Sequence, residues 1–169
     1  STGIEGRHAD PNVFVQMDTY AVKGLQPGQI QFLYAPTHLN PTYEYGVTFE
    51  RGTAVTYGDR KQIFISGTAS IDNKGEIVYP GDILKQAERM LENIDVLLQE
   101  AGAGLQDIMQ AIVYLRDPAD YVVVKQYIES RYPSFPHLIV HAPVCRPGWL
   151  IETECIAVVP ADEPQYACL

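Results

Sequence analysis

The sequence has few cysteines, no cluster of basic residues and no long apolar run. Its three cysteines, Cys145, Cys155 and Cys168, are an odd number without the spacing of a metal site. They suggest a reducing compartment, and we therefore expect a cytoplasmic protein. No apolar stretch approaches the ~18 residues that span a membrane. The polar N-terminal residues do not resemble a signal peptide.

Basic residues are also scarce relative to acidic ones. Twelve Lys and Arg residues face 21 Asp and Glu residues, which gives a formal net charge of -9. A nucleic-acid interface needs a basic stripe, and an anionic membrane attracts clustered cations. We therefore expect neither nucleic acid nor a membrane as a partner.

The chain length and the distribution of turns predict one domain with two flanking segments. A chain of 169 residues is long enough to bury a core without disulfides or metal. Turn-forming residues gather at the beginning, so residues 1–45 are expected to be loops and short strands. Within them, Ile4-Glu5-Gly6-Arg7 spells a protease site used in expression vectors, and a native origin is an equal alternative. Residues 46–160 are expected to form the domain, and residues 161–169 a loosely held tail.

The clearest predicted element is a helix over Asp82–Ala101, where apolar residues recur at helical spacing. Asp82 is its expected N-cap, and Gly102 is its expected stop. A second helix is predicted over residues 118–131. Strands are predicted over residues 47–56, 62–70 and 108–115.

This order predicts an α+β fold with both helices packed on one face of a sheet. Two helices cannot cover all the apolar strand residues, such as Ile63, Ala111, Val140 and Ile156. The other sheet face therefore needs a further partner, for which self-association is the usual solution.

The last apolar segment, Phe135–Val159, conflicts with a purely structural role. It is predicted to form two strands joined by a tight turn at Arg146-Pro147-Gly148, with Cys145 just before the turn. Glu152 and Glu154 lie inside the second strand among apolar residues. Because burying a carboxylate without a partner is costly, we expect the functional site here.

Four ordered motifs between residues 47 and 159 resemble the Rid family, also known as YjgF-type reactive intermediate deaminases. The motifs are Ile65–Thr68 followed by Gly75, the helix from Gln86 to Gly102, Val113–Asp117, and Ile151–Val158. The resemblance implies a chorismate-mutase-like (YjgF-like) α+β fold. It also implies a homotrimer with ligand sites in the clefts between subunits.

The same resemblance implies a chemistry. Well-known members hydrolyse enamine and imine intermediates to 2-keto acids and ammonia, with an arginine that clamps the carboxylate and a glutamate that moves protons through a water. Glu152 matches the glutamate. The motif that carries the arginine reads Pro136-His137-Leu138 here, so Leu138 stands at the clamp position. Leucine cannot form a bidentate clamp, which speaks against ordinary 2-aminoacrylate deamination.

Parts of the chain also resemble the chorismatase branch of this superfamily. These parts are Gly67–Ile71, Val144–Arg146 and Ile151–Glu152. Chorismatases hydrolyse chorismate and are built from two such halves, of which this chain resembles the C-terminal one. The resemblance implies that Cys145 and Glu152 are site residues and that Glu152 acts as a general acid.

The candidate residues each have a plainer alternative. The candidate catalytic residues are Glu152 and Cys145, and the candidate substrate-binding residues are Arg146, Arg51, Ser66, Gly67 and Thr68. Glu152 could equally be a satisfied structural carboxylate, Cys145 a small buried hydrophobe, and Arg146 a solvated side chain. Residues 66–68 could form a plain hairpin rather than present backbone N–H groups to a ligand. Glu154 is expected to be structural or ion-paired.

We expect no metal and no cofactor, because His137 and His141 share a strand face without a third ligand. The predicted function is hydrolysis of a carboxylate-bearing enamine, imine or enol ether at an intersubunit cleft. The alternatives are a chorismatase-like half, or a non-catalytic module that binds a metabolite or a partner. Loss of the clamp arginine favours the module, and the acidic charge disfavours a ribonuclease.

Overall fold

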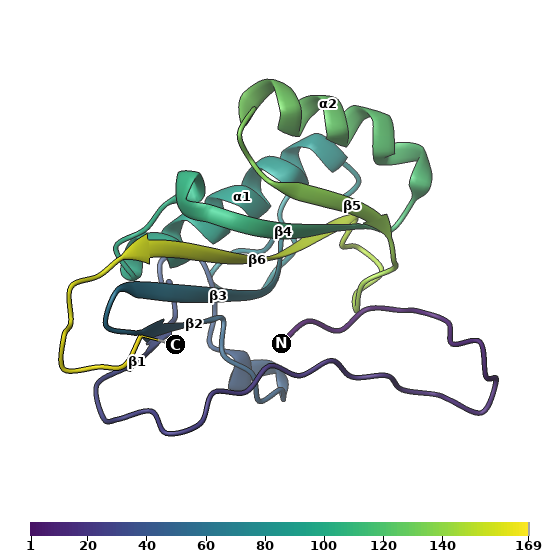
Figure 1. Cartoon of the computed structure of the whole chain (residues 1–169). Helices are drawn as coiled ribbons and strands as arrows, with labels where there is room; N and C mark the ends of the chain where they lie inside the picture. The colour runs from purple at the N-terminus through teal and green to yellow at the C-terminus, as the bar shows by residue number, and fades with distance from the viewer. Residues whose placement is uncertain (169) are drawn as a thin grey trace.

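A six-stranded sheet forms the centre of the molecule (Figure 1). The computed structural model describes residues 1–168, except for the side chain of Tyr45. The strands are β1 (Ile30–Leu33), β2 (Gly52–Thr56), β3 (Arg60–Ala69), β4 (Ile108–Leu115), β5 (His137–His141) and β6 (Ile151–Pro160). They lie in the order β1-β2-β3-β6-β4-β5, and only the β4–β5 pair is parallel. The strand that carries Glu152 is therefore paired on both sides.

Both α-helices, α1 (Ile83–Glu100) and α2 (Tyr121–Arg131), cover the same face of the sheet (Figure 1). The predicted caps of α1 are confirmed, because the Asp82 side chain accepts a hydrogen bond from Lys85 N and Gly102 has a φ of +78°. Met90, Leu91, Ile94, Leu97 and Leu98 of α1 are at most 1% exposed. Burial of each stabilises the fold by roughly 1.5–3 kcal/mol, so packing on the sheet holds α1 in place. The predicted α+β architecture is confirmed.

Three short 3₁₀ helices complete the fold: η1 (Thr42–Tyr45), η2 (Leu105–Asp107) and η3 (Pro118–Asp120). The predicted second helix therefore begins as η3 and becomes α-helical only at Tyr121. The strand predicted over residues 47–56 begins only at Gly52. No helix within residues 1–168 is long and apolar enough to cross a bilayer.

One prediction about the strands is wrong. The last two strands are not joined by a tight turn, because residues 142–150 connect them and β4 lies between them. Parallel pairing of β5 with β4 needs a crossover, which α2 provides, and β6 then pairs antiparallel on the far side of β4. The expectation that the two helices cannot cover every apolar strand residue is confirmed, because Ile63 and Ala111 lie in the core under the helices whereas Val140 and Ile156 face the other side.

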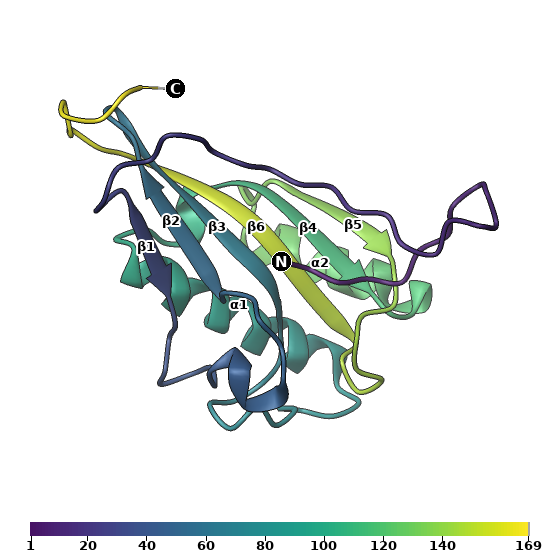
Figure 2. The same cartoon turned by 90° about the horizontal axis from the view of Figure 1, so that it is seen from below.

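The N-terminal segment, residues 1–25, crosses the helix-free face of the sheet (Figure 2). Residues 13–22 form no strand, although their composition suggested one. Ile4 forms an isolated β-bridge with Val144, and Glu5 N donates a hydrogen bond to Pro143 O at 2.8 Å. Ile4 and Glu5 thus lie along the connection between β5 and β6. The predicted tail, residues 161–169, ends in Leu169, which lies outside the described residues.

Candidate active site

Glu152 is the buried acid of the helix-free face. Successive strand residues point to opposite faces, so Ile151, Thr153 and Cys155 face the helices while Glu152 and Glu154 face the N-terminal segment. Glu152 is only 4% exposed, and its Oε2 atom has no hydrogen-bond partner among the described residues. Burial, reinforced by the nearby Glu154 charge, raises the pKa of Glu152 to about 7. Such a group can give or take a proton near neutral pH.

A β-bulge brings the backbone of β3 close to Glu152. The register between β3 and β6 shifts between Ile65 and Thr68. A β-carbon added at Gly67 would lie 2.1 Å from Glu152 Oε1 and 2.8 Å from Thr2 Cγ2. Only glycine therefore fits there with Glu152 and Thr2 where they lie. The Gly67 N–H donates to Thr2 Oγ1 at 2.9 Å, so it points toward the N-terminal segment and is accessible to an oxygen on that side.

The hydroxyl groups on either side of Gly67 hold the bulge. Ser66 Oγ donates to Glu50 O at 2.6 Å and accepts a hydrogen bond from the Ser1 amino group at 2.7 Å. Thr68 is buried, and its Oγ1 donates to Ser66 O at 2.9 Å. Residues 66–68 thus lie in a bulged strand rather than at a hairpin turn, and their role in substrate binding stays a prediction.

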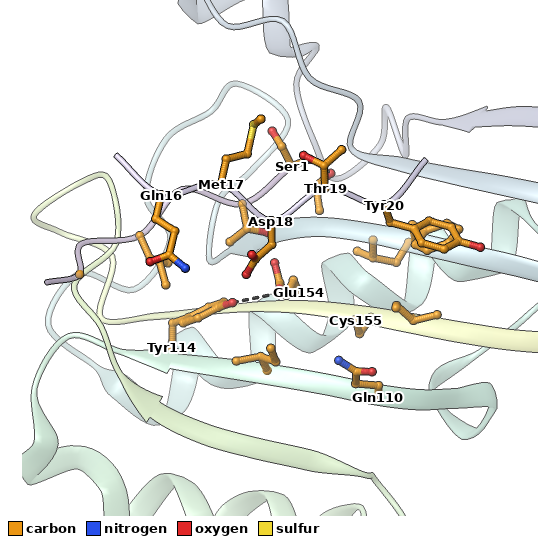
Figure 3. A pocket seen from close by; sticks show the side chains of 18 of the residues that line it. Ser1, Gln16, Met17, Asp18, Thr19, Tyr20, Gln110, Tyr114, Glu154 and Cys155 are labelled. Carbon is orange, nitrogen blue, oxygen red and sulfur yellow. Dashed lines mark hydrogen bonds between the residues drawn. The ribbon is translucent and has the colours of Figure 1, made fainter. Parts of the chain in front are cut away.

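Tyr114 joins the two glutamates. It lies on β4 directly opposite Glu152, and its hydroxyl donates to Glu154 Oε1 at 2.9 Å (Figure 3). Tyr114 is 5% exposed, and burial together with this hydrogen bond raises the pKa of its hydroxyl well above its usual value. It therefore remains a hydrogen-bond donor. Sequence reasoning missed Tyr114, because only the strand register shows that it faces Glu152.

The two candidate arginines contact neighbouring loops. Arg51 is buried, and its guanidinium donates to the backbone oxygen of Asn40 at 2.9 Å and to Asn40 Oδ1 at 2.9 Å. Arg146 Nη1 lies 3.4 Å from Gly75 O, and its guanidinium stacks 5.1 Å from the centre of the Trp149 ring. Their role in substrate binding stays a prediction.

Cys145 and the connection that carries it lie beside the N-terminal segment. Cys145 is exposed, and its Sγ donates to Gly3 O at 3.3 Å, so the buried-hydrophobe alternative is wrong. Arg116, which sequence reasoning also missed, donates to Trp149 O at 2.8 Å and to Arg146 O at 2.7 Å. Through these hydrogen bonds, Arg116 at the end of β4 holds the β5–β6 connection in place.

A cavity of about 1150 Å³ lies between the N-terminal segment and the helix-free face. Tyr114 and Glu154 line it from the sheet, and Asp18 and Tyr20 line it from the segment (Figure 3). Most of its remaining lining is apolar, including Phe64, Ile112 and Ile156. Glu152 lies next to this space but outside its lining.

Comparison with known proteins assigns the family. The model of the family described as endoribonuclease L-PSP matches residues 52–159. The chain belongs to this family. A RutC family protein of Pyrococcus abyssi is 39% identical over 98 residues, which cover 56% of this chain and 76% of the relative. The 3-aminoacrylate deaminase RutC of Acinetobacter baylyi is 30% identical over 99 residues, which cover 57% of this chain and 79% of the deaminase.

A second group of relatives is longer than this L-PSP family chain. A 3-hydroxybenzoate synthase of Streptomyces hygroscopicus is 29% identical over 131 residues, which cover 68% of this chain but only 38% of the synthase. A chorismatase structure has a TM-score of 0.68 at 24% identity and covers 77% of this chain and 44% of the chorismatase. By contrast, the match to a putative endoribonuclease from Thermotoga maritima covers 78% of this chain and 98% of that shorter protein, with a TM-score of 0.64 at 24% identity. The resemblance to the Rid family with chorismatase features is confirmed.

Leu138, at the position where the Rid resemblance expects the clamp arginine, lies on β5 and is 61% exposed. Neither this residue nor its neighbours on β5 can supply a guanidinium. Any carboxylate bound by this L-PSP family protein therefore needs donors from other elements.

Proposed function

We propose that the protein hydrolyses a small carboxylate-bearing enamine, imine or enol ether at a cleft between copies of the chain, with Glu152 as the proton donor. The observation that carries the proposal is the Glu152 carboxyl group. It is 4% exposed, has an oxygen without a partner among the described residues, and has a pKa raised to about 7. A carboxyl group in that environment is half protonated near neutral pH and suits general acid catalysis.

One acid can start all of these reactions. Protonation of the electron-rich carbon of an enamine gives an iminium ion, and protonation of an enol ether gives an oxocarbenium ion. Water then adds to the cationic carbon, and ammonia or an alcohol leaves as the carbonyl group forms. Glu152 gives up its proton in the first step and regains one from the attacking water. The name of one relative, the 3-aminoacrylate deaminase, fits this range, because 3-aminoacrylate is an enamine with a carboxylate.

The remaining candidate residues are assigned to binding. The Gly67 N–H is proposed to donate to a substrate oxygen in place of Thr2 Oγ1, from which it is 2.9 Å away. Arg146 or Arg51 is proposed to attract the carboxylate, and Cys145 to border the site. These residues lie on β3, on the β5–β6 connection and in the loop before β2.

We further propose that the site is completed in a homotrimer. Support comes from the N-terminal segment, where Phe14, Val15 and Met17 are 92%, 83% and 80% exposed. Large apolar side chains gathered on one segment favour contact with another protein surface. A second copy of the chain would also supply donors that the exposed Leu138 cannot.

The alternative is a non-catalytic binding module of the same fold, and Leu138 is the observation that favours it. The two functions are separated by measuring turnover of 3-aminoacrylate, 2-aminoacrylate and chorismate, together with thermal shifts for each compound. Turnover that falls by roughly 10²–10⁴-fold in Glu152→Gln supports the enzyme. Stabilisation without turnover supports the binding module, and full activity in Glu152→Gln contradicts the role of Glu152.

Glu129→Gln is the matched control. It removes one negative charge from the exposed surface of α2, where Glu129 lies 3.7 Å from Lys125 and far from the helix-free face. Turnover should be unchanged in this variant. Sedimentation of the same samples tests the trimer, because a monomer at assay concentration would contradict a shared cleft.

A further inference from the structure

Two acids and a phenol form one cluster on the helix-free face. Glu152 and Glu154 are two positions apart on β6, which places them roughly 6.6 Å apart along the strand. Tyr114 faces Glu152 across the β4–β6 pair, but its hydroxyl reaches diagonally to Glu154 Oε1 at 2.9 Å. The two carboxyl groups therefore have different environments although they share a strand face. Glu154 has a donor and lines the cavity, whereas Glu152 is buried and its Oε2 atom has no hydrogen-bond partner within residues 1–168.

We propose that Tyr114 and Glu154 are positioning residues: the Tyr114 hydroxyl holds the Glu154 carboxyl group beside Glu152, where its negative charge favours the protonated form of Glu152. The inference rests on the proposed function and deepens it, because it says which residues prepare the proton donor. Glu154 has no assigned role in the proposed chemistry, and Tyr114 touches no assumed substrate position.

The physical basis is the fixed position of one carboxyl group beside another. The Tyr114 hydrogen bond keeps Glu154 on the strand face that Glu152 shares, while burial disfavours the charged form of Glu152. Once Glu154 is charged, a second negative charge on the same strand face is repelled. Burial is the larger cause of the raised pKa of Glu152, and the Glu154 charge is the second.

Ionisable groups of both signs lie around Glu152 and Glu154. From the N-terminal segment, the Ser1 ammonium interacts with Glu154, and burial lowers the pKa of that ammonium. Asp18 lines the same cavity and adds negative charge. From β3, the residues next to Glu152 are Gly67 and Ala69, which do not titrate. Cys155 faces the helices, and burial raises the pKa of its thiol to about 12, so it stays neutral.

The experiment measures the titration of Glu152 itself. The chain is labelled with ¹³C at glutamate carboxyl carbons, the Glu152 signal is assigned by its loss in Glu152→Gln, and the signal is followed against pH. The same titration is repeated in Glu154→Gln, in Tyr114→Phe and in the control Glu129→Gln. The pH profile of kcat/KM is recorded for each protein where turnover is found.

In Glu154→Gln, the titration midpoint of Glu152 should fall. Two charges about 6.6 Å apart in a medium of effective dielectric constant about 20 change a midpoint by up to about two pH units. Because Glu154 is half-buried, we expect about one unit. The falling limb of the kcat/KM profile should move down by the same amount.

In Tyr114→Phe, Glu154 loses the donor that holds it beside Glu152 and can turn toward the cavity, so the midpoint of Glu152 should fall, by less than in Glu154→Gln. The midpoint of Glu152 should be unchanged in Glu129→Gln. A Glu152 midpoint that is the same in Glu154→Gln and in the unmodified protein would overturn the inference, whatever the activity. By contrast, full activity of Glu152→Gln contradicts the proposed function alone, so the two failures are distinguishable.

Discussion

Replacing Glu152 with glutamine should remove the loss of stability that ionisation of this carboxyl group causes as the pH rises. The ordinary pKa of this carboxyl group is 4.5, and burial raises it to about 7 in the folded protein. Between these two values the folded state binds more protons than the unfolded state. The free energy of unfolding therefore falls as the pH rises through this window. Glutamine cannot ionise, so this decrease in the free energy of unfolding is absent from the variant.

The magnitude follows from the width of the window. From 4.5 to about 7, at about 1.36 kcal/mol per pH unit, the loss amounts to roughly 3 kcal/mol. The free energy of unfolding of Glu152→Gln minus that of the unmodified protein should thus rise by this amount between pH 4.5 and pH 7, and then stay constant. A fixed offset from the new amide group, whose donors also need partners, is the same at every pH.

Urea denaturation at a series of pH values measures this difference. Trp149, the single tryptophan, packs against both buried clusters and should report unfolding by fluorescence. Glu129→Gln is the control, and its difference from the unmodified protein should be flat within a few tenths of a kcal/mol. A flat difference for Glu152→Gln as well would mean that Glu152 titrates as an ordinary carboxyl group, and the argument for a buried acid would be refuted.

Three further predictions concern the surroundings of this acid. Gly67→Ala places a β-carbon 2.1 Å from Glu152 Oε1. It should destabilise the protein by about 1–3 kcal/mol in urea denaturation, whereas Gly6→Ala, with no atom within 4 Å of its added carbon, should be neutral. Arg116→Met removes the hydrogen bonds to the carbonyl groups of Trp149 and Arg146 in the β5–β6 connection. It should cost about 2–4 kcal/mol and accelerate labelling of Cys145 by a thiol reagent. Proteolytic removal of residues 1–7 should lower the titration midpoint of Glu152 toward 4.5, because Thr2 covers the bulge beside it.

Local patterns in the sequence were sufficient for α1. Its apolar residues recur every three or four positions, and both ends carry residues that favour helix termini, so length and caps could be predicted together. β4 was also predicted with its observed bounds, Ile108–Leu115. In each case the signal lies within the element itself.

The pairing of strands that are far apart in the chain leaves no comparable pattern in the sequence. The tight turn expected between the last two strands was wrong, because nothing in Phe135–Val159 shows that β4 separates them. Tyr114 was missed for the same reason, since its position opposite Glu152 depends on the register of two strands far apart in the chain. The cover formed by the N-terminal segment could not be predicted either, because residues 13–22 have no regular periodicity.

The position of Glu152 on a central strand explains how an ionisable group can stay buried. A carboxylate on a loop would turn toward water and recover its hydration, so its pKa would return to the usual range. β6 is hydrogen-bonded to β3 on one side and to β4 on the other, and the α1 core packs under its opposite face. The backbone at Glu152 therefore cannot move without breaking the sheet. The burial of several α1 side chains, each worth roughly 1.5–3 kcal/mol, exceeds the roughly 3 kcal/mol lost on ionisation of Glu152. An acid with a raised pKa can therefore stay buried in this fold, because the packing of the surrounding sheet contributes more stability than the ionisation of the acid removes.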